Sequence, residues 1–169
     1  MAHGCLSCEE AIYDSLHPQF HTIIRSATEL LALDSDAKPT EEVQRPTFSL
    51  EMGIIWSLCW TVYKCRDPHA RRQALALLRK APREGVWIGD IQACIAERVI
   101  EIEEAPIVDG GADDNASKHW TCKDIPEWHR IHGVDVTLDK PNRLIAMTYS
   151  RRLNGIDGEW NDITEWLKY

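Results

Sequence analysis

Three residues that precede a predicted β-hairpin have the side chains that acid–base catalysis uses. Glu127, His129 and His132 lie close together in the chain, and His119 precedes them. A carboxylate that orients an imidazole is the usual arrangement of a general base. If the chain is an enzyme, we expect this group to hold its catalytic residues; the alternative is that the histidines are exposed residues of a linker. The sequence has no glycine-rich phosphate loop, GxSxG motif or nucleotide-binding fingerprint.

Two other groups have the spacing of metal ligands. The CxxC motif at Cys5 to Cys8 could be half of a zinc site or a redox pair, but a tetrahedral site would need Cys122 or His119 from far along the chain. His17 and His21 are four residues apart, which can place two imidazoles on one face of a helix. We favour a frayed terminus for the first group and a surface or partly buried pair for the second. The sequence therefore predicts no metal and no cofactor.

Composition limits the classes of function that this chain can have. Its 169 residues suffice for one domain with a proper core, and the net charge of −8 argues against direct nucleic acid binding. No N-terminal stretch has the pattern of a secretory signal, so we expect an intracellular protein, nuclear or cytoplasmic, whose six cysteines are free thiols. The most apolar run, residues 52–65, is too short to cross a membrane, because a spanning helix needs about 20 residues.

That apolar run is predicted to be a buried, central helix, since it has apolar residues on nearly every side. Trp56, Cys59, Trp60 and Tyr63 within it could line a ligand pocket. The alternative, which we favour, is that these side chains fill the core, because buried aromatic residues at helical spacing usually do so.

The next helix has strong start and stop signals. Asp67 can cap free backbone N–H groups, and Pro68 suits the first helical position. Pro82 and Gly85 should end the helix. Its apolar face has helical spacing and consists of Ala70, Ala74, Leu77, Leu78 and Ala81.

Two arginines in this helix lie at the end where the helix dipole disfavours cations. Arg71 and Arg72 fall in its first turn, whereas Glu101, Glu103 and Glu104 crowd the C-terminal end of the helix predicted over 90–104. A short connection favours antiparallel packing of the two helices, which would place these charges side by side. We therefore predict that Arg71 or Arg72 pairs with Glu101 or Glu104; the alternative is that all four charges are solvated.

The rest of the chain completes a single, mainly α domain over 1–169, built on antiparallel helix hairpins with a small C-terminal β-hairpin. A helix is expected over 9–33 with a break near Pro18, and flexible loops over 34–47 and 105–118. Alternating apolar residues predict the β-hairpin at 134–150. Trp160, Ile163 and Trp166 have helical spacing and predict a short terminal helix.

Much of the sequence resembles the C-terminal part of the regulatory domain of fungal six-cysteine zinc-cluster transcription factors. The most distinctive similar block runs from Lys64 to Gly85. The other similar segments are Phe48–Ile54, Trp87, Ile102–Glu104, Ile125–Trp128 and Tyr13-Asp14 with Phe20.

The resemblance implies a nuclear, helical regulatory region, and many members of the family sit in secondary-metabolite pathways. The chain departs from the family at its N-terminus, where Cys5 and Cys8 are followed by no cysteine until Cys59, so it cannot build the zinc cluster. We therefore expect a non-enzymatic regulatory or protein-interaction module that has no DNA-binding domain of its own and contacts a protein partner or a small-molecule ligand. The alternative is a small secondary-metabolism enzyme of the isomerase or cyclase type on a recruited helical scaffold.

Overall fold

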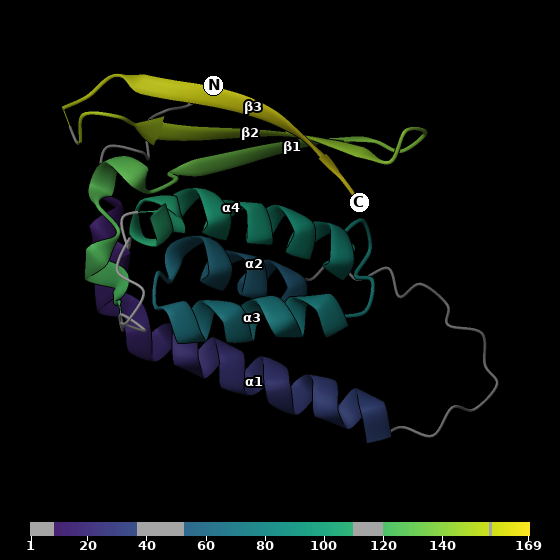
Figure 1. Ribbon diagram of the computed structural model, residues 1–169. Helices are drawn as coiled ribbons and strands as arrows, with labels where there is room; N and C mark the ends of the chain where they lie inside the picture. Colours follow the sequence, from purple (N-terminus) through teal and green to yellow (C-terminus); the bar gives the residue numbers. More distant parts are fainter. Residues whose placement is uncertain (1–8, 37–52, 110–119, 156) are drawn as a thin grey trace.

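The computed structural model describes residues 9–36, 53–109, 120–155 and 157–169. These residues form a stack of helices with a β-sheet over one side, and α4 lies between the sheet and the other helices (Figure 1). The elements in chain order are η2 (Glu10–Leu16), α1 (His17–Asp36), α2 (Ile54–Lys64), α3 (Pro68–Lys80), α4 (Gly89–Asp109), η3 (Cys122–Asp124), η4 (Glu127–His129), β1 (Gly133–Asp139), β2 (Leu144–Arg152) and β3 (Trp160–Lys168).

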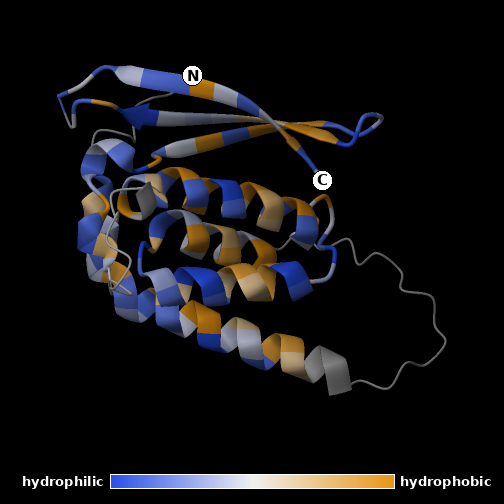
Figure 2. Ribbon diagram, in the orientation of Figure 1, coloured by the Kyte–Doolittle hydropathy of each residue, from blue (hydrophilic) through white to orange (hydrophobic). Residues whose placement is uncertain are grey.

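The first expected helix is divided into two parts near Pro18. A 3-10 helix, η2, ends at Leu16, and α1 begins at His17, so Pro18 falls in the first turn of α1. A proline there sacrifices no intrahelical hydrogen bond, because the first N–H groups of a helix have no partner within it. The apolar face of α1 places Phe20, Ile24 and Ala27 in the helical core, and hydrophobic and hydrophilic patches alternate along the helix (Figure 2).

Local signals fix α3 as expected. The Asp67 carboxylate accepts a hydrogen bond from the Ala70 N–H at 2.8 Å, and Pro68 is the first residue of the helix. Gly89, where α4 begins, lies against the end of α3: a Cβ atom there would be 2.4 Å from the Leu78 carbonyl oxygen. Only glycine permits this close approach, so the start of α4 is held beside the end of α3.

α4 is buried on two faces, which explains why its sequence is weakly amphipathic. Ala93, Ala96 and Ile100 belong to the core shared with α1, α2 and α3. A second stripe faces the sheet and forms another core with Ile131 and with Ile145, Met147 and Tyr149 of β2; its members are Ile91, Ile95, Val99 and Ile102. The helix therefore joins the two halves of the structure.

The sheet is antiparallel in the order β1-β2-β3, with Val136 opposite Met147 and Met147 opposite Glu165. The first two strands form the hairpin expected at 134–150. The short terminal helix expected from Trp160, Ile163 and Trp166 is wrong, because these residues lie in β3. Along β3, side chains instead alternate between a face that reaches the core and an exposed face, and Trp166 is on the exposed one.

The fold class expected from the sequence is thus correct only in part. Helices followed by a C-terminal antiparallel sheet are present, but the third strand makes the described structure mixed α and β rather than mainly α. The expected loops also begin later than predicted: α1 continues to Asp36 and α4 passes through Pro106 to Asp109. Residues 37–47 and 110–118 of those loops lie outside the described residues. Just before Pro106, Glu103 pairs with Arg66 and Arg71, and Glu104 pairs with Arg72.

Candidate functional site

The centre of the molecule contains a cluster of buried charges built around Glu103. Arg66 Nη2 donates to Glu103 Oε1 at 2.8 Å, Arg66 Nε donates to Oε2 at 3.2 Å, and Arg71 Nη2 donates to Oε2. The backbone N–H of Ile131 donates to Oε1 at 2.7 Å. All three charged side chains are fully buried. Burial alone would raise the pKa of Glu103, but Arg66 and Arg71 hold it down to about 2, so the carboxylate stays charged.

Glu10 of η2 extends this cluster toward the surface. Lys64 Nζ donates to Glu10 Oε1 at 2.7 Å, and Arg66 Nη1 donates to Oε2 at 2.9 Å. Lys64 also donates to the backbone carbonyl of His132 at 2.9 Å. The side chains of Glu10 and Lys64 are only 5% and 6% exposed. Three cations, Lys64, Arg66 and Arg71, thus meet the carboxylates of Glu10, Glu103 and Glu104, and we call these six residues the charge cluster.

One of the expected pairs is present, because Arg72 in the first turn of α3 reaches Glu104 near the end of α4. Arg72 Nη2 lies 2.5 Å from Glu104 Oε2, and Arg71 Nη1 lies 3.6 Å from Glu104 Oε1. Glu101 takes no part: it is exposed and accepts from Arg98 at 2.9 Å. The main partner of Arg71 is Glu103, which is four residues after Val99 and eight after Ile95. This helical spacing places Glu103 on the buried stripe of α4, and it could have identified Glu103 from the sequence as a buried acid.

The predicted catalytic group is only partly assembled. Glu127 Oε1 lies 3.3 Å from His132 Nε2, and Glu10 Oε1 lies 3.8 Å from His132 Nδ1. The Glu127 carboxylate also accepts the backbone N–H groups of Glu10 and Ala11 at 2.7 and 3.0 Å. No hydrogen bond or ion pair within the described ranges joins His129 to Glu127 or His132. Burial, with a further contribution from Arg151, lowers the pKa of His129.

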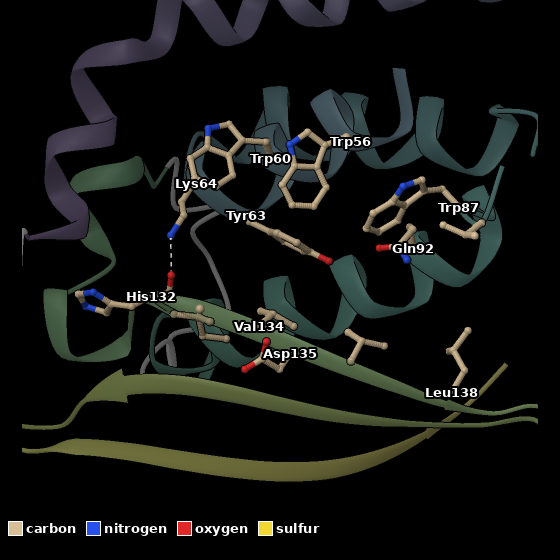
Figure 3. Close-up of a pocket in the computed structure, with 14 residues that line it drawn as sticks. Trp56, Trp60, Tyr63, Lys64, Trp87, Gln92, His132, Val134, Asp135 and Leu138 are labelled. Atoms are coloured by element: carbon tan, nitrogen blue, oxygen red, sulfur yellow. Dashed lines mark hydrogen bonds between the residues drawn. The ribbon is translucent and has the colours of Figure 1, made fainter. Parts of the chain in front are cut away.

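This geometry gives Glu127 and His132 a structural role. Both ring nitrogens of His132 face carboxylates, and the edge of the ring packs against Trp160 with centroids 5.1 Å apart. Neither nitrogen points toward a space where a substrate could lie, and the side chain is turned away from the neighbouring cleft (Figure 3). Hydrogen bonds from backbone N–H groups and from His132 oppose the effect of burial and lower the pKa of Glu127. The pair joins η2 to the segment before β1.

A cleft of about 460 Å³ lies between α2 and the edge strand β1. Trp56, Trp60 and Tyr63 of α2 and Trp87 from the α3–α4 connection form one side (Figure 3). The other side includes Val134, Asp135, Val136 and Leu138 of β1, and the remaining lining residues are Lys64, Val86, Gln92, Ile131, His132 and Gly133. Trp56 and Trp60 are 39% and 38% exposed, so the preference for pure core packing is wrong for these two side chains.

Cys59, the fourth pocket candidate, lies behind the cleft and not in its lining. Its side chain is buried, its Sγ atom is 3.7 Å from Gln92 Oε1, and burial raises the pKa of its thiol to about 12. Position 59 comes three residues after Trp56, yet it falls on the face of α2 that meets the helical core. The sequence could not separate these two faces because both are apolar.

The sequence analysis also missed a helix cap that is formed by an acidic residue from a distant part of the chain. The Glu84 carboxylate accepts the first N–H groups of α2, those of Ile54 and Ile55, at 3.0 and 3.1 Å. Gly53 makes room for this contact, since a Cβ atom there would lie 2.3 Å from Glu84 Cδ. The contact links the α3–α4 connection, which carries Trp87, to the helix that carries Trp56. The two rings pack with centroids 5.5 Å apart.

The possible metal ligands give no site in the part of the chain that can be described. His17 and His21 stack edge to face with their Nε2 atoms 3.2 Å apart. No cluster of three or more histidine, cysteine or acidic side chains suited to a metal occurs among the described residues. Cys5, Cys8 and His119 lie outside those residues. Cys59, Cys65, Cys94 and Cys122 are free thiols.

Comparisons with known proteins add no identification. No protein-family model, curated protein or solved structure matches the chain. Among the described helices, none has the length and apolar character needed to cross a bilayer.

Proposed function

We propose that this chain is a non-enzymatic regulatory module whose cleft between α2 and β1 holds a small apolar ligand. The cleft carries the proposal: it is concave, it is lined mostly by aromatic and aliphatic side chains, and its tryptophans remain partly exposed. Ligand sites in proteins commonly have this composition, with a few polar groups that set orientation. A ligand here would touch elements from both hydrophobic cores, so its binding can stabilise the helical stack and the sheet together.

The regulatory part of the proposal rests on sequence similarity. From the Lys64 to Gly85 block we propose kinship with the regulatory domains of fungal zinc-cluster transcription factors, action in the nucleus and a role in secondary-metabolite regulation. The antiparallel pairing of α3 with α4 through Arg72 and Glu104 suits a helix-hairpin unit of such a domain. With a net charge of −8, the chain would reach DNA only through a partner.

Binding of a neutral hydrophobic dye tests the ligand site. Nile red fluorescence should rise on titration with the protein and saturate at one dye per chain. Trp56→Ala should weaken binding at least about ten-fold, because an aromatic wall of the cleft is removed. Trp166→Ala is the matched control, since Trp166 is an exposed tryptophan of β3 outside the cleft, and it should leave binding unchanged. Equal binding by both variants would contradict the proposed site.

A reporter assay tests the regulatory role. The chain is fused to a heterologous DNA-binding domain and expressed beside a reporter gene in a filamentous fungus. The proposal expects reporter transcription to change relative to the DNA-binding domain alone, and expects Trp56→Ala to alter that response. A fusion that is expressed and folded but leaves transcription unchanged in every growth condition would contradict a regulatory role.

A small enzyme of the isomerase or cyclase type is the second candidate, and the Glu127 to His132 distance of 3.3 Å is the observation that favours it. His132 would act as acid or base after its ring turned toward the cleft. If the purified protein converts a pathway metabolite, His132→Gln should abolish the conversion while His129→Ala leaves it intact. Unchanged conversion in both variants would remove this candidate.

A further inference from the structure

The edge strand β1 is not fully covered on the face that is turned toward the helices. Val136 is 38% exposed, although Met147, its cross-strand neighbour on β2, is fully buried in the core against α4. Both side chains lie on this inner face, because residues opposite each other in antiparallel strands share a face. The helices therefore cover the inner face of β2 but leave that of β1 open to the cleft.

The backbone of β1 is paired on one side only. In the described sheet its only neighbour is β2. Because alternate residues of a strand direct their N–H and C=O groups to opposite edges, about half of these groups in β1 point away from β2. Among the described residues, no hydrogen bond outside the pairing with β2 involves the backbone of residues 134–138. In Figure 3, α2 lies beyond this free edge, so a strand added there would run through the cleft beside the tryptophans.

The sequence of β1 protects this edge poorly against another strand, but it disfavours a second copy of itself. Soluble proteins block sheet edges with proline, lysine or β-bulges, whereas β1 has neither residue and pairs with β2 without interruption over all seven positions. Its charged residues are Asp135 and Asp139. Pairing two copies of β1 would bring four acids together on chains that each carry a net charge of −8. The free edge therefore favours a strand of opposite charge.

The charge of β1 lies on the outer face of the sheet. Asp135 is exposed and stands opposite Thr148 of β2, whose hydroxyl is 2.9 Å from that of Thr164 of β3. The row of side chains across the sheet at this level therefore carries no positive charge. A lysine or arginine on the outer face of an added strand can pair with the Asp135 carboxylate, because side chains opposite each other on adjacent strands are in contact.

We infer that β1 is a docking edge for an extended segment of a partner protein in which apolar residues alternate with basic ones. The segment adds a fourth strand: its apolar side chains enter the cleft between Val136 and the indoles of Trp56 and Trp60, and its basic side chains lie on the outer face beside Asp135. In this mode of recognition, main-chain hydrogen bonds give affinity and alternate side chains give specificity. The inference rests on the proposed function, since it names a partner for the same cleft, where a small apolar ligand would compete with it.

An acetylated and amidated heptapeptide of alternating lysine and valine, with lysine at both ends, tests the inference on the purified chain. It should displace Nile red from the cleft and bind with a stoichiometry of one peptide per chain in isothermal titration calorimetry. Hydrogen–deuterium exchange followed by NMR reports strand pairing directly. Alternate amides of β1, those that face away from β2, should exchange at least about ten-fold more slowly in the saturated complex, because each gains a hydrogen bond.

Matched peptides and variants separate the parts of the inference. A peptide of the same composition with its three valines in one block cannot place them all on one face, and it should bind at least about ten-fold more weakly. Replacing the lysines by glutamates should also weaken binding. Asp135→Asn should weaken binding of the lysine peptide about two- to five-fold. Asp162→Asn, the same change at an exposed residue of β3, should leave it unchanged.

The outcomes distinguish this inference from the proposed function. If Nile red binds but the peptide does not, or binds without slowing the alternate amides of β1, the inference is overturned and the proposed ligand site stands. A peptide that binds with these amides protected, on a chain that binds no dye, would support the inference and contradict the small-ligand proposal. Slow exchange of all β1 amides in the free protein would also overturn the inference; analytical ultracentrifugation would then show whether a second copy or the same chain fills the edge.

Discussion

The charge cluster and the aromatic cleft lie side by side, and Lys64 belongs to both. In the charge cluster each charged group meets an opposite charge, and its residues are almost completely buried. In the cleft, by contrast, large aromatic surfaces remain partly exposed. Buried charges that are paired with opposite charges stabilise one arrangement of the chain, whereas partly exposed aromatic side chains are free to contact a ligand. The most polar region is therefore structural, and the more apolar one is the proposed binding surface.

The largest effect on stability is expected when the charge at the centre of the cluster is removed. Glu103→Gln keeps the shape of the side chain but leaves Arg66 and Arg71 without their shared carboxylate. Loss of one partner from a buried ion pair costs about 3–5 kcal/mol, so we expect the free energy of unfolding in urea to fall by that amount. Glu101→Gln, three residues from Glu104 but exposed, is the control and should cost less than about 0.5 kcal/mol. A loss below about 1 kcal/mol for Glu103→Gln would mean that the cluster does not stabilise the fold.

Lowering the pH should protonate Glu103 and so weaken the same charge cluster. The pKa of Glu103 is lowered in the folded protein from an ordinary value of 4.5 to about 2. Its contribution to stability is therefore complete above about pH 4.5 and is lost as the pH falls toward 2. The shift corresponds to about 3 kcal/mol.

Urea unfolding of wild type and of Glu103→Gln at a series of pH values between 6 and 2 measures the contribution of the Glu103 charge to the free energy of unfolding. The wild type should lose stability more steeply, and the difference between the two proteins should shrink by about 3 kcal/mol at the acid end. Parallel pH profiles would show that Glu103 titrates alike in the folded and unfolded states, and would contradict the assigned role of the arginines.

A substitution in the cleft should separate stability from binding. Trp56→Ala removes a large side chain, but 39% of it is already exposed and its neighbour Trp87 can cover part of the gap. We expect a loss of about 1–2 kcal/mol in the free energy of unfolding, well below that of Glu103→Gln, together with Nile red binding that is at least about ten-fold weaker. If Trp56→Ala destabilises the protein as strongly as Glu103→Gln, the aromatic wall is part of the core and the comparison fails.

The smallest effect is expected at Cys59, immediately behind the cleft wall. Its thiol is buried, with a pKa raised by burial to about 12, whereas Cys94 and Cys122 are partly exposed. A thiol reagent such as 5,5′-dithiobis(2-nitrobenzoic acid) should therefore modify Cys94 and Cys122 before Cys59 and leave Cys59 unmodified in the folded protein. Peptide mapping by mass spectrometry identifies the modified positions. Rapid modification of Cys59 would show that the cleft opens into the helical core.

Sequence reasoning succeeded where the determining interactions are local. The start of α3 follows from Asp67 and Pro68, which act within one helical turn, and the β1–β2 hairpin follows from alternation beside a turn at Pro141. It failed at β3, where Trp160, Ile163 and Trp166 fit a helical period as well as a strand. Pairing with β2 decides between these two structures, and that partner cannot be identified from the segment itself.

The sequence predicted some residues of the candidate site but not how they are arranged. Trp56, Trp60 and Tyr63 were identified as possible pocket residues, but the opposite side of the cleft comes from β1, about 70 residues away in the chain. Glu127 and His132 do meet, yet only the position of Glu10 beside them shows that the pair is structural. Glu103 lies in the same acidic run as Glu101 and Glu104, and burial alone makes it the central residue.

The amino-acid sequence by itself determined the local elements and the two sets of opposite charges that bring the start of α3 to the end of α4. Hydrogen bonds and dipole interactions within one or two helical turns depend on residues that are close in the sequence, so they can be inferred without knowing the tertiary structure. Only the tertiary structure decided which acid is buried, which face of α2 is open, and that β1 lies opposite the tryptophans. Burial and the distances between remote segments depend on how the helices and the sheet pack together, and these quantities distinguish the buried charge cluster from the proposed binding surface.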